Sequence, residues 1–559
     1  MIEQIEIVKG GGSSLYGAGA IAGTINMIMR RPAFNSVSVN YVGNSQDGAY
    51  DQQISTMAEI VSDDNNSGFY VFGSTRSRNP YDRNGDGFTE LSILKNETIG
   101  FNGYLRPRNN SELQISFHKI FEERRGGSDL DKPVHEARIA EMTKHYKYGG
   151  KVKWIQKLSP VFEYKVNYAF SILERDSYYG GLAEDTPEAR LAALNYYGFS
   201  ENPLHTGRVQ FNYILNNHLM IAGVQYDHDH LLDKSVSSAL YHVDETFKNL
   251  GVYLQDEISF DENDQFQLVA GVRFDNHSSL ENWIISPRLN IKYKLLETLS
   301  IRAGITSGFK APQIFDEDLH ICGLEGTQRV IRNSSGLKEE KSFSYTAGFE
   351  FQDFVGEIPV LVGITGFYTR LSDAYAEEFI SANGNIEYWE RINSSGADVK
   401  GIEIDFGIKL VRTLEIRTGF TFKNNTYREN VTDFNTHNFL RTPDIFGYAR
   451  ASYTISTGFT AFVSMKYTGS MYVPHEIVVD DQEYPLLKLT KSPSFVELDF
   501  ALTHKVKLFG DVTSDISVGV KNLTNAFQKD LDYGVTRDPG YVYGPMQPRT
   551  FYFSTNLRI

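Results

Sequence analysis

Long apolar runs are missing from this sequence of 559 residues. No stretch reaches the ~18 apolar residues that a membrane-spanning helix needs, so a helical membrane protein is excluded. Basic residues are also scarce, because 55 Lys and Arg stand against 70 Asp and Glu. The net charge of -15 argues against a nucleic-acid partner, which would require a basic face. Cys322 is the single cysteine, which rules out an intrachain disulfide framework and a thiolate metal cluster.

Two further signals are missing. The first residues, Met1 to Glu6, lack the basic segment and apolar core of a secretion signal. We therefore expect that a signal was removed or that the chain starts partway through a longer protein. The sequence also has no Ser/His/Asp hydrolase elbow and no zinc-protease helix, so we predict that the protein is not an enzyme.

Aromatic residues and period-two alternation dominate what is present. Phe and Tyr number 37 and 33 and recur in short extended segments, which suits strands on a half-buried surface. Apolar and polar residues alternate through 164–172, 414–423 and 496–503, as in a strand with one apolar and one wet face. A soluble sandwich also alternates, but so many long strands without helices would be hard to pack in one soluble domain.

The spacing of the connections favours a membrane barrel over a sandwich. Short polar turns are expected at 63–67, 106–111, 158–160, 216–217, 261–264 and 456–458. They alternate with long Gly- and Asp-rich stretches at 79–91, 123–147, 175–206, 307–341, 426–440, 470–492 and 522–546. The sequence therefore predicts an all-β fold, a transmembrane antiparallel barrel of about 22 strands with short turns at one end and long loops at the other.

Two of the long loops carry helix signals, and the C-terminal end of the chain carries a strand signal. Thr186 and Pro187 open a good helix over 188–194, and 133–144 is a second helix candidate. The last residues, from Phe551 to Ile559, alternate in polarity, so the chain ends inside a strand. That strand must pair with the first strand, because an open sheet edge cannot exist in lipid.

The first 33 residues differ from the rest. Small residues between Gly10 and Gly23 permit tight turns and close backbone approach, and 24–28 is predicted to be a short buried strand. A glycine-rich nucleotide loop is the alternative, but it needs a Lys-Ser/Thr pair or a helix after the glycines, and neither is present.

This segment resembles the last part of the plug domain of TonB-dependent outer-membrane receptors, whose pattern runs roughly I-E-x-I-E-V-x-x-G-P-x-S-x-x-Y-G-x-x-A-x-x-G-x-I-N-I-I. The matching residues are Lys9, Gly10, Ser14, Tyr16, Gly17, Ala20, Gly23 and Asn26. Gly11 stands where the family usually has proline. Similar family elements are Phe309–Pro312 (F-x-A-P), Leu337–Glu340 with Ser342, Val518–Asn525 and Pro548–Thr550. The resemblance predicts a plug remnant over 1–33 and a receptor barrel over 34–559.

The resemblance implies energy-coupled import of a scarce metal complex across the bacterial outer membrane. A ferric siderophore or other iron complex is the first expectation, with haem and cobalamin as alternatives within the family. In the family, loops and plug apices bind the ligand, and a TonB box near the start of the plug pairs with the TonB–ExbB–ExbD complex. Most of the plug and the TonB box are absent from this sequence. A plugless passive pore or a gene fragment is therefore the alternative of another class.

Several loop residues are candidates for binding. Asp82, Asn84, Asp86 and Gly87 fit the start of a calcium loop, although Ile93 holds the position of the closing glutamate; calcium is the one metal expected. Asp316, Asp318 and His320 follow the F-x-A-P element; by resemblance to haem receptors His320 could ligate haem, and a solvated or calcium-binding loop is the alternative. Further candidates for ligand contact are Asp227 to His230, Tyr472, His475, Asp530, Asp532, Asp538, Tyr541 and Tyr543. Outer-membrane lipids are expected partners, and the sequence leaves open whether a surface lipoprotein covers the loops.

Overall fold

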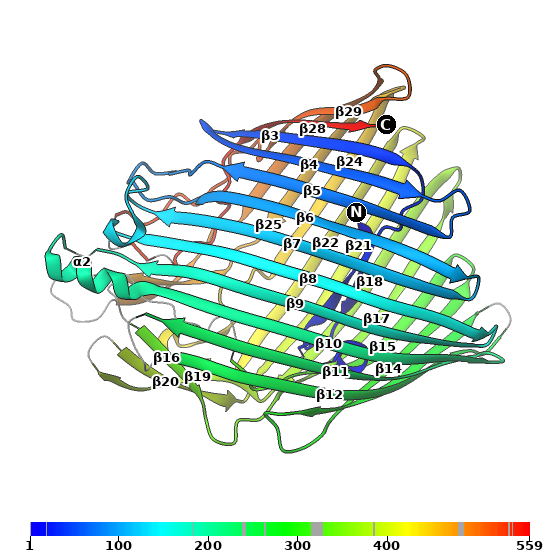
Figure 1. Ribbon diagram of the computed structural model, residues 1–559, viewed down its shortest axis with the longest axis horizontal. Helices are drawn as coiled ribbons and strands as arrows, with labels where there is room; N and C mark the ends of the chain where they lie inside the picture. The colour runs from blue at the N-terminus through cyan, green and yellow to red at the C-terminus, as the bar shows by residue number, and fades with distance from the viewer. Residues whose placement is uncertain are drawn as a thin grey trace.

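The computed structural model describes residues 2–559 except 18, 183, 237–241, 262–263, 315–327, 384–385, 479–485, 535–536 and 539. Nearly all of its regular structure is β-strand (Figure 1). Twenty-two strands form the wall of a closed antiparallel barrel, as predicted. They are β3 (Ser36–Gln46), β4 (Ala49–Val61), β5 (Ser67–Arg78), β6 (Ile93–Arg108), β7 (Ser111–Gly127), β8 (Ala140–Ser159), β9 (Phe162–Gly180), β10 (Tyr197–Leu215), β11 (His218–Ser235), β12 (His242–Ser259), β13 (Phe266–His277), β14 (Ile284–Leu296), β15 (Leu299–Lys310), β17 (Glu340–Val355), β18 (Ile358–Ser372), β21 (Ala397–Val411), β22 (Leu414–Val431), β24 (Ile445–Ser456), β25 (Phe459–Thr468), β28 (Phe495–Lys507), β29 (Thr513–Lys521) and β30 (Thr550–Arg558).

The barrel closes between its first and last wall strands. β3 pairs with β30 in a register that sets Val39 opposite Leu557 and Ser45 opposite Phe551. Val37 and Ile559 extend the contact by exchanging two backbone hydrogen bonds of 3.0 and 3.1 Å. The prediction that the chain ends in a strand paired with the first one is confirmed, and the wall leaves no sheet edge open to lipid.

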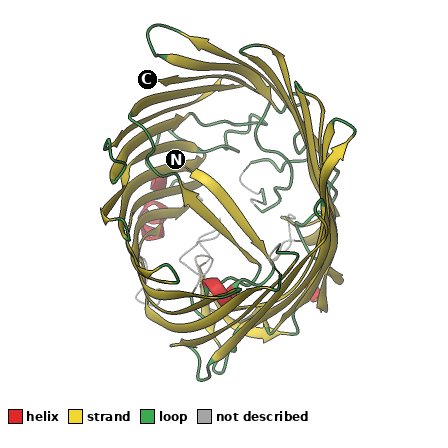
Figure 2. Ribbon diagram, turned by 90° about the vertical axis from the view of Figure 1, so that its right-hand side faces the viewer, coloured by secondary structure: helices red, strands yellow, loops and turns green. Residues whose placement is uncertain are grey.

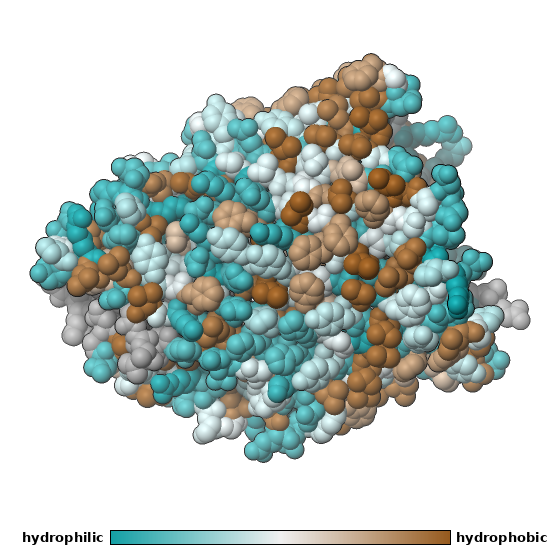
Figure 3. Space-filling model, viewed as in Figure 1, coloured by the Kyte–Doolittle hydropathy of each residue, from teal (hydrophilic) through white to brown (hydrophobic). Residues whose placement is uncertain are grey.

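The two ends of the barrel differ. Short connections at 62–66, 109–110, 160–161, 216–217, 297–298, 356–357, 412–413 and 457–458 lie at one end, and the long connections lie at the other, here called the outer end. The outward faces of the wall carry a band of exposed apolar side chains; Val252 and Leu254 on β12 are examples. Figure 3 shows more of these hydrophobic residues toward the short turns, at the right, and a more hydrophilic surface toward the long loops.

Strands enter two of the predicted loops. The stretches 123–147 and 175–206 contain the outer halves of β7 to β10, so the irregular connections shrink to 128–139 and 181–196. The predicted helix over 133–144 is wrong. The structure has one 3-10 turn, η1 (Val134–Glu136), before β8 begins, because Val134, Ala137 and Ala140 pack against Tyr178 of β9. Cross-strand pairing therefore overrides the local helix signal.

The helix predicted after Thr186 is confirmed. α2 (Pro187–Ala193) has Pro187 in its first turn, and the Thr186 hydroxyl accepts a hydrogen bond of 3.1 Å from the backbone N–H of Ala189. A 3-10 turn, η2 (Leu194–Tyr196), joins it to β10. In the part of the chain that the structure describes, no helix has the length and apolar character to cross a membrane.

Small sheets extend the outer end. β16 (Gln328–Asn333), β20 (Ile386–Ser394) and β19 (Ala374–Asn383) form one sheet in that order, and β26 (Tyr472–Ile477) and β27 (Leu486–Lys491) form a hairpin. The turn η4 (Thr432–Phe434) and the short β23 (Thr436–Asn438) lie beside β22. These elements build a rim beyond the wall, in the region where the sequence places its candidate ligand residues.

The N-terminal segment lies inside the barrel. β1 (Ile2–Lys9) and β2 (Gly23–Met29) form an antiparallel hairpin with α1 (Ser13–Tyr16) between them. Figure 2, which looks along the barrel, shows this hairpin crossing the lumen. The strand predicted at 24–28 is present, but it is not buried, because Ile25 and Met27 are 64% and 58% exposed. The hairpin spans the lumen without filling it.

Candidate functional site

Three backbone contacts attach the N-terminal segment to the barrel wall. The backbone N–H of Phe309 donates to the Ser13 hydroxyl at 3.1 Å, and the N–H of Gly19 donates to the Phe309 carbonyl at 3.0 Å. The Ser342 hydroxyl donates to the Ile21 carbonyl at 2.8 Å. Phe309 and Ser342 belong to two of the four sequence elements singled out within the barrel, so those two elements hold the segment in place.

Gly11 lies at the closest approach of the segment to the wall. Its N–H donates to the Ser344 hydroxyl at 3.2 Å. A Cβ at Gly11 would lie 2.4 Å from the carbonyl carbon of Ser307 and 2.6 Å from the nitrogen of Gly308, both backbone atoms. Gly11, which replaces the family's usual proline, is thus required because the wall backbone leaves no space for a Cβ, and glycine also reaches the turn geometry of this position.

The other signature residues have local roles. Lys9 forms an ion pair with Glu403 of β21, and the Asn26 amide donates to Glu6 across the hairpin at 2.9 Å. Ser14 and Ala20 are buried. The remaining ones, Gly10, Gly17 and Gly23, have positive φ angles, and Tyr16 ends α1. All eight therefore belong to one segment docked on the wall.

A buried ion pair lies in the wall beneath Gly17. The Arg273 Nε donates to both carboxylate oxygens of Asp275 at 2.9 Å, and neither side chain has exposed surface. The Asn249 amide also donates to Asp275, at 2.9 Å. The two terminal nitrogens of Arg273 have no hydrogen-bond partner among the described residues. One of them, Nη2, lies between Gly17 and Gly251, where a Cβ on either glycine would be 2.9 or 2.0 Å from it.

The exit from the segment to β3 is fixed by two ion pairs. Arg30 pairs with the buried Glu59 of β4, which also accepts a hydrogen bond of 2.6 Å from the N–H of Ala33. Arg31 pairs with Glu112 of β7, a carboxylate shared with Arg106 at 2.9 Å. The segment is therefore anchored at its last residues as well as at α1.

At the outer rim, the last long loop packs against β26. The His475 ring stacks on Tyr541 with 3.6 Å between ring centroids, and His475 Nε2 lies 2.9 Å from Asp532. Tyr541 and Tyr543 both donate their hydroxyls to Asp530. Tyr541 is 3% exposed, and its burial together with the Asp530 carboxylate raises its pKa to about 12.

Two other candidates join the same cluster. Asp538 accepts a hydrogen bond of 2.9 Å from the N–H of Glu476, and Tyr472 starts β26. The structure thus brings His475, Asp538, Tyr541 and Tyr543 together at the rim, with Tyr472 at the start of the strand that carries His475. Their polar groups are paired with Asp530, Asp532 and backbone N–H groups. We call this group the rim cluster.

The aspartate-rich loop predicted to hold calcium lies beside the rim cluster. Carboxylate oxygens of Asp82, Asp86 and Glu90 lie within 4.8 Å of one another. The residue that converges with the aspartates is Glu90, not one at the position of Ile93. Arg537 of the last loop pairs with Asp86 at 3.3 Å and with Glu90 at 3.2 Å.

Hydrogen bonds hold the same loop. Asp82 accepts from the N–H groups of Gly85 and Gly87 at 2.7 and 2.8 Å, and the Asn84 side-chain oxygen accepts from the N–H of Asp86 at 3.2 Å. Burial raises the pKa of Glu90, although the Arg83 N–H and Arg537 oppose this shift. The loop has oxygen ligands of the kind that calcium prefers, and in this structure the Arg537 guanidinium is the positive charge that pairs with them.

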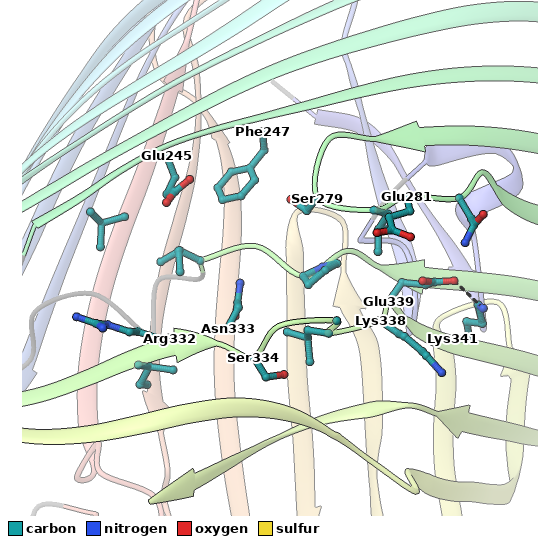
Figure 4. A pocket seen from close by; sticks show the side chains of 18 of the residues that line it. Glu245, Phe247, Ser279, Glu281, Arg332, Asn333, Ser334, Lys338, Glu339 and Lys341 are labelled. Carbon is teal, nitrogen blue, oxygen red and sulfur yellow. Dashed lines mark ion pairs between the residues drawn. The ribbon is translucent and has the colours of Figure 1, made fainter. Parts of the chain in front are cut away.

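A cavity of about 1020 Å³ opens at the outer end. It lies between the first residues of β12, the 278–283 connection and β16 (Figure 4). Its charged side chains are Glu245, Glu281, Arg332, Lys338, Glu339 and Lys341, and Phe247 supplies an aromatic surface. Lys341 is paired with Glu339 at 2.6 Å, whereas Arg332 and Lys338 form no ion pair with another described residue.

The F-x-A-P element connects this cavity to the N-terminal segment. Pro312 lines the cavity, and Phe309 and Ala311 pack with Ile284 and Leu280 beneath it. Three residues earlier, the backbone of Phe309 makes the two hydrogen bonds to Ser13 and Gly19. One short stretch of chain therefore contacts both the cavity and the segment inside the lumen.

Sequence reasoning did not assign these cavity residues a role. Lys338 belongs to the family element Leu337–Glu340 and Lys341 follows it, and Arg332 had no motif to mark it. The candidates Asp316, Asp318 and His320, like Cys322, lie outside the described residues.

Comparison with known proteins identifies the class. Residues 34–523 match the family model "TonB dependent receptor-like, beta-barrel", and the chain belongs to this family. The protein is an integral β-barrel of the bacterial outer membrane.

Particular relatives are distant. The iron-regulated outer membrane virulence protein of Vibrio cholerae is 20% identical over 96% of this chain and 78% of its own length. The vitamin B12 transporter of Vibrio vulnificus is 24% identical over 64% of this chain and 53% of its own. The ferric enterobactin receptor of Pseudomonas aeruginosa has the same fold, with a TM-score of 0.77 at 16% identity over 100% of this chain and 85% of that one. By name, the second of these is a transporter and the third a receptor.

Proposed function

We propose that this protein is a receptor for energy-coupled uptake of a ferric siderophore or a related iron complex, without enzymatic activity. Iron-regulated and ferric-siderophore receptors among the relatives support iron as the cargo. The family supports coupling to TonB, for which the TonB–ExbB–ExbD complex is the proposed partner. The N-terminal part of a plug would carry the contact with TonB.

One observation carries the proposal: the F-x-A-P element contacts the outer cavity through Pro312 and the N-terminal segment through Phe309. A ligand that fills the cavity would press on the same stretch that holds the segment in the lumen. Arg332 and Lys338, which form no ion pair among the described residues, suit an anionic complex. The cavity volume is at the upper end of the range of small-molecule sites, as a bulky complex requires.

Growth rescue tests the cargo. A strain without its own iron-complex receptors, expressing this protein, would be grown under iron chelation with single ferric complexes of different charge. We expect rescue by an anionic ferric complex. The variant Arg332→Ala/Lys338→Ala should need roughly tenfold more of it, since two charge-assisted contacts are removed. Lys488→Ala, on β27, is the matched control for loss of an exposed lysine and should behave as wild type.

Cobalamin is the second candidate, favoured by the vitamin B12 transporter among the relatives. The same strain, placed under cobalamin limitation, decides between the two. Rescue by cobalamin together with failure of every ferric complex would contradict the iron proposal and leave the cobalamin receptor in its place.

A further inference from the structure

The outward faces of β10, β11 and β12 show where the apolar band of the barrel ends. Val209 and Phe211 on β10, Val224 on β11, and Leu250 on β12 are exposed apolar residues of that band. On β9 and β11 the band reaches Tyr168 and Tyr226, which are 47% and 45% exposed. Tyrosines with an exposed ring and a polar tip collect at the level of lipid headgroups, so they indicate the membrane border.

A row of nitrogen side chains lies next to this border on the outward face. His205 of β10 is directly opposite His228 of β11, and His228 is directly opposite Lys248 of β12. Directly opposed residues have Cβ atoms ~4.5–5.5 Å apart, so the three side chains are neighbours. They share the outward face with the band because His205, His228 and Lys248 are an even number of residues from Val209, Val224 and Leu250.

Two contacts orient the row. Tyr168 OH lies 2.8 Å from His205 Nδ1, which leaves Nε2 of that ring directed to other partners. The backbone of Lys248 exchanges hydrogen bonds with Ser278, one to the hydroxyl at 3.0 Å and one from the N–H at 2.8 Å. The His205 ring is therefore held by Tyr168, and the backbone at Lys248 is held to the neighbouring strand end.

The charge around the row favours an anion over a metal ion. His230, one step further out, is already paired with Asp244 at 2.9 Å. Lys248 beside His228 would repel a metal cation, whereas two imidazoles and an ammonium group together suit a phosphate. Among the outward-facing carboxylates of these strands, Glu201 is four residues from His205, beyond the row. This concentration of basic groups contrasts with the net charge of -15 of the whole chain.

We propose that His205, His228 and Lys248 bind the phosphate group of a lipid in the outer leaflet of the outer membrane. The row faces away from the lumen, next to the apolar band, where the charged groups of the surroundings are lipid phosphates. The lipid's acyl chains would lie against Val224, Leu250 and their neighbours. This binding surface does not depend on which cargo the receptor carries.

Native mass spectrometry of the full chain in detergent tests the proposal. The delipidated protein is titrated with a phosphorylated outer-leaflet glycolipid, with its dephosphorylated form, and with inorganic phosphate as competitor. The test variant is His228→Gln/Lys248→Gln. The matched control is His437→Gln/Lys488→Gln, which removes one exposed histidine on β23 and one exposed lysine on β27, both at the outer end.

We expect the phosphorylated lipid to bind wild type and control equally, and the test variant roughly fivefold or more weakly, since charge-assisted hydrogen bonds are lost. The dephosphorylated lipid should bind all three proteins as weakly as the phosphorylated lipid binds the test variant. Equal binding of the phosphorylated lipid to all three proteins would overturn the proposal, as would equal binding of both lipids to wild type. Displacement of the lipid by submillimolar inorganic phosphate would reassign the row to free anions. Gel mobility with and without heating shows that each variant remains a folded barrel.

Discussion

Replacement of Gly11 by alanine should loosen the N-terminal segment without opening the barrel. The added Cβ would lie 2.4 Å from the Ser307 carbonyl carbon and 2.6 Å from the Gly308 nitrogen, below the 3.0 Å that real Cβ contacts essentially never cross. Both atoms belong to the backbone of β15, where Ser307 and Gly308 are held in register by their pairing with β17. The segment must therefore move away from the wall.

The cost follows from the contacts that this movement stretches. These are the hydrogen bonds from Gly11 N–H to Ser344, from Phe309 N–H to Ser13, and from Gly19 N–H to Phe309. Each contributes ~0.5–1.5 kcal/mol net, so loss of all three destabilises the docked segment by about 2–4 kcal/mol. Local opening of the segment should then rise by roughly 30- to 1000-fold.

Hydrogen exchange of residues 2–29, compared with the barrel strands, measures this change. Exchange of the segment should accelerate by the stated factor in Gly11→Ala, whereas the wall strands keep wild-type rates. Gly207→Ala is the matched control, because a Cβ there meets no atom within 4 Å. Wild-type exchange of the segment in Gly11→Ala would refute the close approach described here.

Three further predictions concern the wall and the outer loops. Arg273→Met leaves the Asp275 carboxylate buried without its cation and should lower the free energy of unfolding by ~3–5 kcal/mol, measured by denaturant titration of the barrel. The double variant Arg273→Met/Asp275→Leu should recover most of that loss. An unchanged free energy of unfolding in the single variant would contradict the buried pair. Arg537→Ala should raise the affinity of the Asp82–Glu90 loop for Ca²⁺ by roughly tenfold in calorimetric titration, because the guanidinium that pairs with Asp86 is removed. Equal Ca²⁺ affinities of the variant and the wild type would mean that this loop is no cation site. Because the pKa of Tyr541 is raised from 10.0 to about 12, its hydrogen bond to Asp530 stabilises the rim below pH 10 and is lost as the pH rises through about 12. In an ultraviolet titration, Tyr541→Phe should lack one phenol that ionises near pH 12 in the wild type. If the missing phenol is instead one that ionises near pH 10, the burial of Tyr541 is contradicted.

Much of the architecture could be predicted from the sequence. Alternation through 164–172 and 414–423 indicates strands by itself, because outward and inward faces meet different solvents in a barrel. The strand count and the closure by Phe551 to Ile559 followed from the same pattern. The glycine-rich signature identified the N-terminal segment, although its strand proved exposed in the lumen.

Features that depend on distant pairing could not be predicted. The stretch at 133–144 has a helical composition, yet from Ala140 onward it is strand β8, because β7 and β9 supply partners for it. Glu90 converges with Asp82 by the folding of its loop, so a sequence pattern that expects the last ligand at Ile93 misses it. The outer cavity combines β12, the 278–283 connection and β16, and no local motif encodes that combination.

Uptake of radiolabelled iron tests the central claim most directly. Cells with the gene for this protein deleted and then restored would be given a ferric siderophore, with and without functional TonB. The account predicts uptake that requires both this protein and TonB. Uptake that persists without TonB would show a passive pore, and equal uptake by deleted and restored cells for every ferric complex would contradict iron as the cargo.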